Sequence, residues 1–407
     1  MNSSGKHKWT FRSRFRRNAF GWRSQPAMKR IKEAVSEIRK VARKDPVLGA
    51  EGAVLFLEKV SPALMHVDSS SGAIGNAVYF AIEALAAVIA GAPADDRVRD
   101  EWLKRLWQAV EDDEMPYIEA LPGYWGDLCA TPECASRWAD EFIGIVRTVW
   151  SPDRPPGAYF KGTTACLSAL LKAGRNDEIL ELLDLAPSKY WYERKWGVKA
   201  LLAMGKTAKA LQYAEDSGNK YENPAGIALA CEEILLAEGM SERAYRQYAI
   251  AASHKSTYLA TFRAIAAKYP DKGRADILRD LIASTPGKEG KWFAAAKSAG
   301  LYGVAIELAN STPCDPRTLT RAARDWASEE PHFALQAGIA ALRWLVEGYG
   351  FEITSLDVWA AYNHTMKAAR ELGCEDETRV RIRDLVASET TRGRFVTDIL
   401  GRTLGLS

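Results

Sequence analysis

Apolar side chains recur with helical spacing along most of the chain. Beyond Lys29, the residues Ile31, Ala34, Val35 and Ile38 follow i, i+3, i+4, i+7 spacing, which is typical of an amphipathic helix. Basic side chains lie off this stripe, so the helix should carry a basic outer face. No stretch shows the sustained alternation of apolar and polar residues that indicates a β-strand. The pattern therefore predicts an all-α protein.

Helix start signals divide the pattern into separate elements. Asp45-Pro46 places an N-cap residue before a proline at the first helical position, and the helix should end near Val60. Ser61-Pro62 repeats the signal. Further helices are expected at residues 73–92, 95–110, 135–150, 292–308, 318–326, 333–347, 355–372 and 377–388.

The alanine-rich segment 73–92 is about as long as a bilayer is thick. However, Glu83 lies near its middle, and a central carboxylate costs roughly 2.5 kcal/mol or more on membrane insertion. Alanine contributes little to offset that cost. We therefore expect a helix buried between neighbouring helices, and no membrane contact.

A linker signal separates the two halves of the chain. Residues 151–157 contain three prolines and a glycine, which cannot continue a helix. The predicted organisation is a basic aromatic arm at residues 1–28, an N-terminal helical domain at 29–150 and a repeat domain at 158–407.

A short sequence motif recurs in the chain after residue 158. LLKAGRNDEILELL at residues 170–183 recurs in related form at 201–214 and 235–249, so that Gly174, Gly205 and Gly239 lie 31 and 34 residues apart. A looser copy contains Gly273. Each unit reads as helix, glycine turn, helix, because glycine suits the left-handed conformation that ends a helix. Stacked hairpins of this kind form an α-solenoid, and the period resembles tetratricopeptide repeats. The helices beyond residue 290 fit either divergent repeats or a capping bundle.

Several longer segments resemble an uncharacterised bacterial family of helical proteins. They are residues 8–23, 257–270, 289–309, 315–326 and 348–369. The resemblance spans nearly the whole chain and implies a bacterial cytoplasmic protein. It implies no activity, cofactor or catalytic residue.

Charge is unevenly distributed. Residues 1–44 contain fourteen Lys and Arg against two Glu, or +12, whereas the whole chain carries +3, so the remainder carries −9. Five large aromatic residues interleave with the arginines of the arm. The arm could bind an external polyanion or dock on its own acidic body. The candidate polyanion-binding residues are Arg12, Arg14, Arg16, Arg17, Arg23, Lys29, Arg30, Lys32, Arg39 and Lys40.

A second candidate surface is the aromatic cluster that follows residue 189. One reading makes it a partner-binding groove on a solenoid face, and the other makes it core between two repeats. Its residues are Tyr190, Trp191, Tyr192, Arg194 and Trp196.

Signals for catalysis or metal binding are weak. Cys129 and Cys134 form one C-x4-C pair, whereas structural zinc needs four ligands. No phosphate-binding loop, nucleophile elbow or H-E-x-x-H motif occurs. The acidic run at residues 111–114 reads as a solvated loop end, and His364 as a hydrogen-bonded partner. We expect no catalytic residue, no metal and no cofactor, and the scattered cysteines favour the cytoplasm.

Three hypotheses follow. The first is a scaffold that binds a protein or peptide partner. The second is a nucleic-acid-binding solenoid that uses the basic arm, against which the acidic balance of the body counts. The third is a HEAT-like enzyme that acts on nucleic acid.

Overall fold

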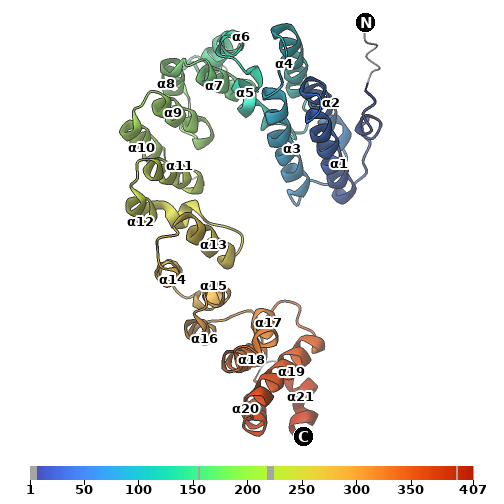
Figure 1. The fold of residues 1–407 in the computed structure, drawn as a ribbon, viewed down its shortest axis with the longest axis vertical. Coiled ribbons are helices and arrows are strands. Elements are labelled where there is room, and N and C mark those ends of the chain that lie inside the picture. The colour runs from blue at the N-terminus through green and yellow to red at the C-terminus, as the bar shows by residue number, and fades with distance from the viewer. Residues whose placement is uncertain (1–6, 155, 218–223, 391–392, 407) are drawn as a thin grey trace. The chain divides into compact units, whose positions relative to one another are not determined.

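The chain folds into helices joined by short connections. A computed structural model describes residues 7–154, 156–217, 224–390 and 393–406, and every regular element in those ranges is helical (Figure 1). The all-α prediction is confirmed. The chain divides into two compact units, Met1–Asn223 and Pro224–Ser407, which are described separately below.

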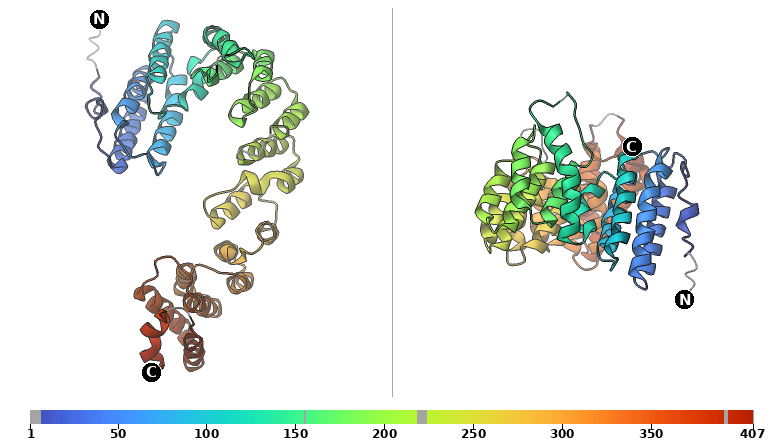
Figure 2. Two further views of the ribbon diagram at one scale, coloured as in Figure 1. Left: turned by 180° about the vertical axis from the view of Figure 1, so that it is seen from behind. Right: turned by 90° about the horizontal axis from the view of Figure 1, so that it is seen from above.

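The first unit begins with three long helices. They are α1 (Ser24–Ala42), α2 (Pro46–Leu64) and α3 (Ala73–Ala90), and each packs against the other two (Figure 2). The Asp45 carboxylate accepts a hydrogen bond from the Leu48 amide at 3.0 Å, which confirms the predicted N-cap. However, α2 continues through Pro62 to Leu64, because its last turn is held from outside. Ser61 bonds Asp113, and the Tyr117 hydroxyl donates to the Leu64 carbonyl.

The basic arm docks on this bundle. Trp9, Phe11 and Phe15 are buried, and both phenylalanine rings meet Phe56 of α2 edge-on. Trp9 lies so close to Gly52 that a Cβ at that position would overlap its ring. Phe11 begins a short 3-10 helix, η1 (Phe11–Ser13), and α1 already begins at Ser24 rather than at residue 29. Of the two alternatives for the arm, the structure shows docking of Trp9, Phe11 and Phe15, whereas Trp22 stays exposed.

The helix α4 (Asp96–Glu111) is fixed to the bundle by charged side chains. Arg105 donates to Glu51 and Glu58 of α2 at 2.8 and 2.7 Å. The buried Arg99 of α4 donates to the carbonyls of Ile89 in α3 and of Leu128 in α5 (Trp125–Cys129), and so links these two helices. These bonds satisfy carbonyls that a helix end leaves unpaired.

The rest of the first unit continues without a break across the predicted linker. It comprises η2 (Leu121–Tyr124), α5 (Trp125–Cys129), α6 (Pro132–Trp150), α7 (Thr163–Lys172), α8 (Asn176–Leu185), α9 (Trp191–Ala203) and α10 (Thr207–Glu215). Phe160, just beyond the prolines, packs on Trp107 and Phe142, and α7 packs against α5 and α6. The units therefore divide at residues 223 and 224, not at 151–157 as the sequence predicts.

In three of the repeats, the first helix ends in the same type of glycine turn. Gly174, Gly205 and Gly239 have φ of 74°, 71° and 73°, as predicted, and the amide that follows each glycine bonds the carbonyl five residues back, at 2.8–2.9 Å. This is a Schellman motif, which reverses the chain after a helix. Gly300 and Gly373 repeat the same geometry. By contrast, Gly273 has φ of −57° and precedes its helix instead of ending one, so the looser fourth copy lacks this turn.

The second unit contains the remaining hairpins and a terminal bundle. Its elements are α11 (Pro224–Ala237), α12 (Ser241–Ala252), α13 (Tyr258–Lys268), α14 (Arg274–Ala283), η3 (Glu289–Trp292), α15 (Phe293–Ser298), α16 (Tyr302–Ser311), α17 (Pro316–Trp326), α18 (Pro331–Val346), α19 (Ser355–Glu371), α20 (Glu375–Ala387) and α21 (Phe395–Leu404). The mostly buried α18 packs against α16, α17, α19, α20 and α21. The last helices thus form a bundle around α18.

Docking of the arm makes Trp9 a stabilising residue. We expect Trp9→Ala to lower the free energy of unfolding by about 3 kcal/mol, because a large side chain is lost from a packed site. Circular dichroism during chemical denaturation measures this change. The control is Trp22→Ala, which removes a ring that is 72% exposed and should change stability by at most about 0.5 kcal/mol. Equal effects of the two substitutions would contradict docking.

Asp357 joins α17 to α19. Arg317 donates to both of its oxygens, at 2.7 and 2.9 Å, and the Thr354 amide donates at 2.8 Å. The Arg317 hydrogen bonds hold the pKa of Asp357 well below its usual value. The carboxylate therefore stabilises the fold above its unfolded pKa of about 4, and the contribution is lost as the pH falls further.

We expect Asp357→Asn to cost about 1–2 kcal/mol at neutral pH, through the lost cap and ion pair. The difference from the unsubstituted protein should narrow below about pH 4. Thermal melts from pH 7 to pH 3 test this, with the exposed Asp271→Asn as a control. A difference that stays constant over this range would contradict the ion-pair assignment.

Candidate functional site

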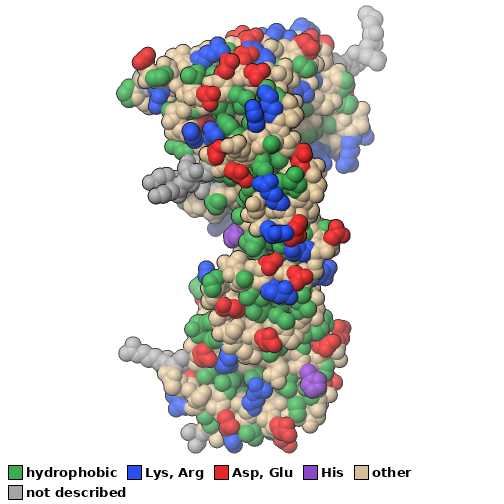
Figure 3. Space-filling view, turned by 90° about the vertical axis from the view of Figure 1, so that its left-hand side faces the viewer, with side chains coloured by type: hydrophobic (Ala, Val, Ile, Leu, Met, Phe, Trp, Pro, Cys, Tyr) green, Lys and Arg blue, Asp and Glu red, His purple; other side chains and the backbone are tan. Residues whose placement is uncertain are grey.

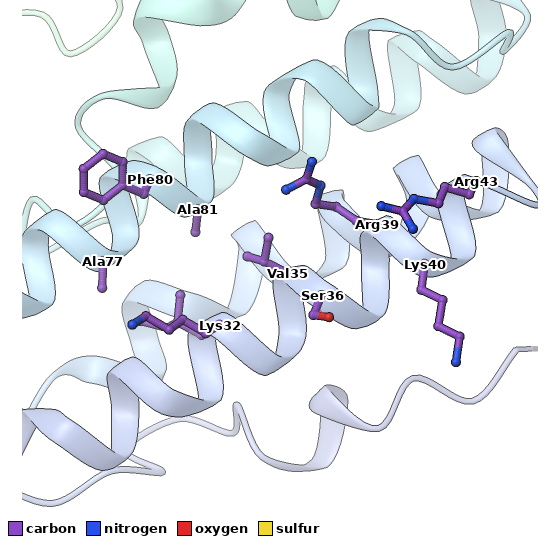
Figure 4. Close-up of a pocket in the computed structure, with 10 residues that line it drawn as sticks. Lys32, Val35, Ser36, Arg39, Lys40, Arg43, Ala77, Phe80 and Ala81 are labelled. Carbon is purple, nitrogen blue, oxygen red and sulfur yellow. The ribbon is translucent and has the colours of Figure 1, made fainter.

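A groove between α1 and α3 is the clearest candidate binding site of the first unit. It has a volume of about 550 Å3 and an apolar floor that includes Ile31 and Ala81. Figure 4 shows Lys32 near one end, Arg39 and Arg43 toward the other, and Val35 between them. Lys40 lies at the outer edge and points away from α3. The groove combines an apolar floor with a cationic rim.

The helical period of α1 separates its charges onto two sides. Lys32, Arg39 and Arg43 are spaced seven and four residues apart, so they share one side of the helix. Glu33 and Glu37 are four residues apart and share the other side. The cations therefore border the groove, whereas the carboxylates face the arm.

The two carboxylates of α1 are occupied by the arm. Glu37 accepts hydrogen bonds from the amide and hydroxyl of Thr10, at 2.7 and 2.5 Å. Glu33 accepts from Arg14 and Arg30, at 2.9 and 2.6 Å. The Arg30 hydrogen bond lowers the pKa of Glu33 below its usual value, so Glu33 stays ionised. Both carboxylates are thus engaged, and neither forms an ion pair with Lys32, Arg39 or Arg43 in the described part of the chain.

The cations of the groove have no acidic partner within the described residues. The side chains of Lys32, Arg39, Lys40 and Arg43 form no ion pair there, whereas Arg105 and Arg175 each pair with two carboxylates. Elsewhere the signs are mixed, and over the face shown in Figure 3 basic and acidic side chains are interspersed. The groove is thus a local concentration of positive charge.

The α3 wall is more exposed than the sequence suggests. Phe80 and Tyr79 are 64% and 48% exposed, and only 39% of the residues of this helix are buried. Among the described residues, α3 is the one helix that is long and apolar enough to cross a membrane by length and composition. In the structure it packs against α1, α2 and α5. The helix expected to be buried between neighbours therefore has an exposed apolar face.

The structure divides the ten predicted polyanion-binding residues into three groups. Arg14 and Arg30 pair with Glu33, and Arg17 lies 3.9 Å from Glu114. Arg12 and Arg16 are exposed on the arm. The others border the groove or an adjoining hollow of about 990 Å3, and these are Arg23, Lys29, Lys32, Arg39 and Lys40.

Sequence reasoning did not select two of the groove residues. Arg43 lies four residues after Arg39, so helical spacing could have placed it with the others. Phe80 belongs to an alanine-rich helix that reads as buried core, and no local signal marks it as exposed.

The aromatic cluster of α9 is split between core and surface. Arg194 and Trp196 are buried, and the Arg194 guanidinium donates to Ser217 and lies over the Tyr213 ring. Tyr190 and Tyr192 are 43% and 55% exposed and stack on each other. The half-buried Trp191 lies between them in sequence. The five residues thus do not form one groove, because Arg194 and Trp196 are buried whereas Tyr190 and Tyr192 are exposed.

Asp113 of the acidic run and the cysteine pair singled out in the sequence are buried in the fold. Asp113 was expected in a solvated loop end, but it is 8% exposed and accepts hydrogen bonds from Ser61 and the Ile118 amide. Its burial raises its pKa. Cys129 and Cys134 are buried free thiols. Within the described residues, no three His, Cys, Asp or Glu side chains are placed to hold a metal ion.

The second unit contains another charged hollow, between α17 and α19. It has a volume of about 420 Å3 and contains Arg317, Arg321, Arg324 and His364. However, Arg317 pairs with Asp357, and Arg324 pairs with Asp325. Burial and the nearby Arg324 lower the pKa of His364, so this hollow is less cationic than the α1–α3 groove.

Comparisons with known proteins add little. No protein-family model matches the chain, and no curated protein matches it. A chain from the solved "Crystal structure of APC/C hetero-tetramer Cut9-Hcn1" is 13% identical, over 88% of this chain and 76% of that chain, with a TM-score of 0.22. That likeness carries no argument about function. The repeated glycine turns and paired helices identify the chain by themselves. It is a helical-repeat protein.

The charge separation on α1 predicts different effects of neighbouring substitutions. Glu37→Ala should lower the free energy of unfolding by about 1–2 kcal/mol, because the Thr10 and Phe11 amides lose a charged acceptor. The combined Arg39→Ala and Arg43→Ala variant should change the free energy of unfolding by at most about 0.5 kcal/mol per site. Chemical denaturation compares them. Equal destabilisation by the arginine pair would show that these cations serve the fold instead of a ligand.

Proposed function

We propose that the protein is a non-enzymatic helical-repeat scaffold that binds a protein or peptide partner. The α1–α3 groove carries the proposal, because it combines an apolar floor with cations that the described residues leave unpaired. Interfaces in proteins commonly use an apolar centre with a charged rim. Lys32 to Arg43 extends about 17 Å along α1, at 1.5 Å per residue, which is long enough for several side chains of a partner.

The fold supports this proposal in general terms. Stacked helical hairpins present long surfaces that are mostly used for binding. The fold does not itself determine a function, so the argument depends on the groove.

Nucleic-acid binding is the second candidate, because the groove and arm are both rich in Lys and Arg. Arg14 and Arg17 of the arm and Arg30 of α1 lie beside carboxylates of the same chain. Residues 45–407 also carry a net charge of −9, whereas a body that wraps nucleic acid is expected to be basic. These observations favour a protein partner.

Crosslinking and affinity capture from cells that make the protein test the proposal. A partner that depends on the groove should be recovered with the unsubstituted chain and lost with the combined Arg39→Glu and Arg43→Glu variant. The control is the combined Arg379→Glu and Arg381→Glu variant, which makes the same charge change at exposed positions of α20. It should retain the partner.

Two results would overturn this assignment. Identical recovery by all three chains would remove the groove as the binding site. Recovery that disappears after nuclease treatment, and with the combined Arg12→Glu and Arg16→Glu variant, would favour the nucleic-acid alternative.

A further inference from the structure

We propose that the occupant of the α1–α3 groove is an amphipathic α-helix from another protein, with acidic residues along one flank. This inference rests on the proposed function and adds the chemistry of the partner. It follows from the shape of the floor, the position of the cations and the charge that the described residues leave unbalanced.

The floor suits the apolar face of a helix. It lies between two helices and includes Val35 of α1 and Ala77 and Ala81 of α3. Small side chains on a supporting helix allow another helix to approach to about 8–10 Å between axes. Phe80 stands at one side of this floor and is 64% exposed, so it offers a large apolar surface to the incoming helix. This is the helix-in-groove mode of recognition, in which residues at i, i+3, i+4 and i+7 enter the groove.

The cations at the rim favour a partner with negative charge. Lys32, Arg39 and Arg43 follow the groove at intervals of seven and four residues, so a helix lying parallel to α1 can present a carboxylate to each one at similar intervals. Glu33 and Glu37 do not supply these carboxylates, because they are already engaged by Thr10, Arg14 and Arg30. Carboxylates on a ligand would complement these exposed cations in sign.

Two other anionic ligands fit this geometry less well. A membrane surface meets side chains that protrude. Phe80 protrudes, but Val35, Ala77 and Ala81 lie between the helices, where a bilayer surface would not reach them. A single-stranded nucleic acid gains from aromatic stacking platforms, but the lining of this groove includes one aromatic residue, Phe80. Both remain outcomes of the test below.

Selection from a displayed library of random 16-residue peptides tests the proposal. The full chain serves as bait, and the combined Arg39→Glu and Arg43→Glu variant serves as the counter-selection bait. Enriched peptides should have a helical apolar stripe and a net negative charge. Fluorescence polarisation should show at least about tenfold weaker binding to the variant, and binding within about twofold for the combined Arg379→Glu and Arg381→Glu control.

A charge exchange makes the test specific. Peptides in which Glu is replaced by Lys should lose affinity for the unsubstituted chain and regain it for the Arg39→Glu and Arg43→Glu variant. Phe80→Ser should weaken the acidic peptides without altering the salt dependence, because it removes apolar contact and no charge. Circular dichroism of each variant establishes that it is folded.

Three results would overturn the inference. Enriched peptides could lack a helical stripe or negative charge, or no peptide could distinguish the two baits. Alternatively, vesicles containing phosphatidylserine, or double-stranded DNA, could bind with the same dependence on Arg39 and Arg43 and displace the peptides. A groove-dependent partner captured from cells would still support the proposed function if the peptides proved extended, so the two proposals fail separately.

Discussion

The hydrogen bonds between the arm and the carboxylates of α1 determine the character of the first unit. Glu33 and Glu37 are the acidic residues of α1, and the arm binds both on the side away from the groove. This contact agrees with the rotation set by the buried stripe of α1, which contains Ala27, Ile31, Ala34 and Ile38, while Trp9, Phe11 and Phe15 pack against α2. The same rotation leaves Lys32, Arg39 and Arg43 beside the exposed face of α3. Stability and binding surface therefore arise from one distribution of charge around one helix.

Much of the fold could be predicted because its signals are local. The left-handed turns at Gly174, Gly205 and Gly239 need glycine at a fixed distance from the helix end, and the sequence repeats that distance. Gly300 and Gly373 make the same turn, but the residues around them have diverged, so the repeat could not be followed by sequence similarity. Gly273 shows the opposite case, in which a glycine at the expected period begins a helix. Spacing alone does not reveal the sign of φ.

The candidate site could be predicted only in part. The sequence identified Lys32, Arg39 and Lys40 as cations on an outer helical face. It could not separate them from Arg14 and Arg30, because that division depends on which side of α1 the arm occupies. Similarly, the exposure of Phe80 depends on how α3 packs against its neighbours, and not on the composition of α3. The boundary at residues 151–157 was misplaced for a related reason, since prolines end a helix but do not prevent the next helix from packing back.

The segment that follows the prolines packs back on α4, and this affects how the first unit folds. Lys161, beyond the prolines, donates its ammonium protons to the carbonyls of Val110, Glu111 and Asp113, at 3.1, 2.9 and 2.9 Å. The end of α4 is therefore completed by a residue that follows it by about fifty positions. The segment up to Trp150 is an incomplete cooperative unit, because α7 and Lys161 supply partners that it lacks. On a ribosome, the bundle of α4, α5 and α6 cannot reach its final packing until the chain has been synthesised through α7.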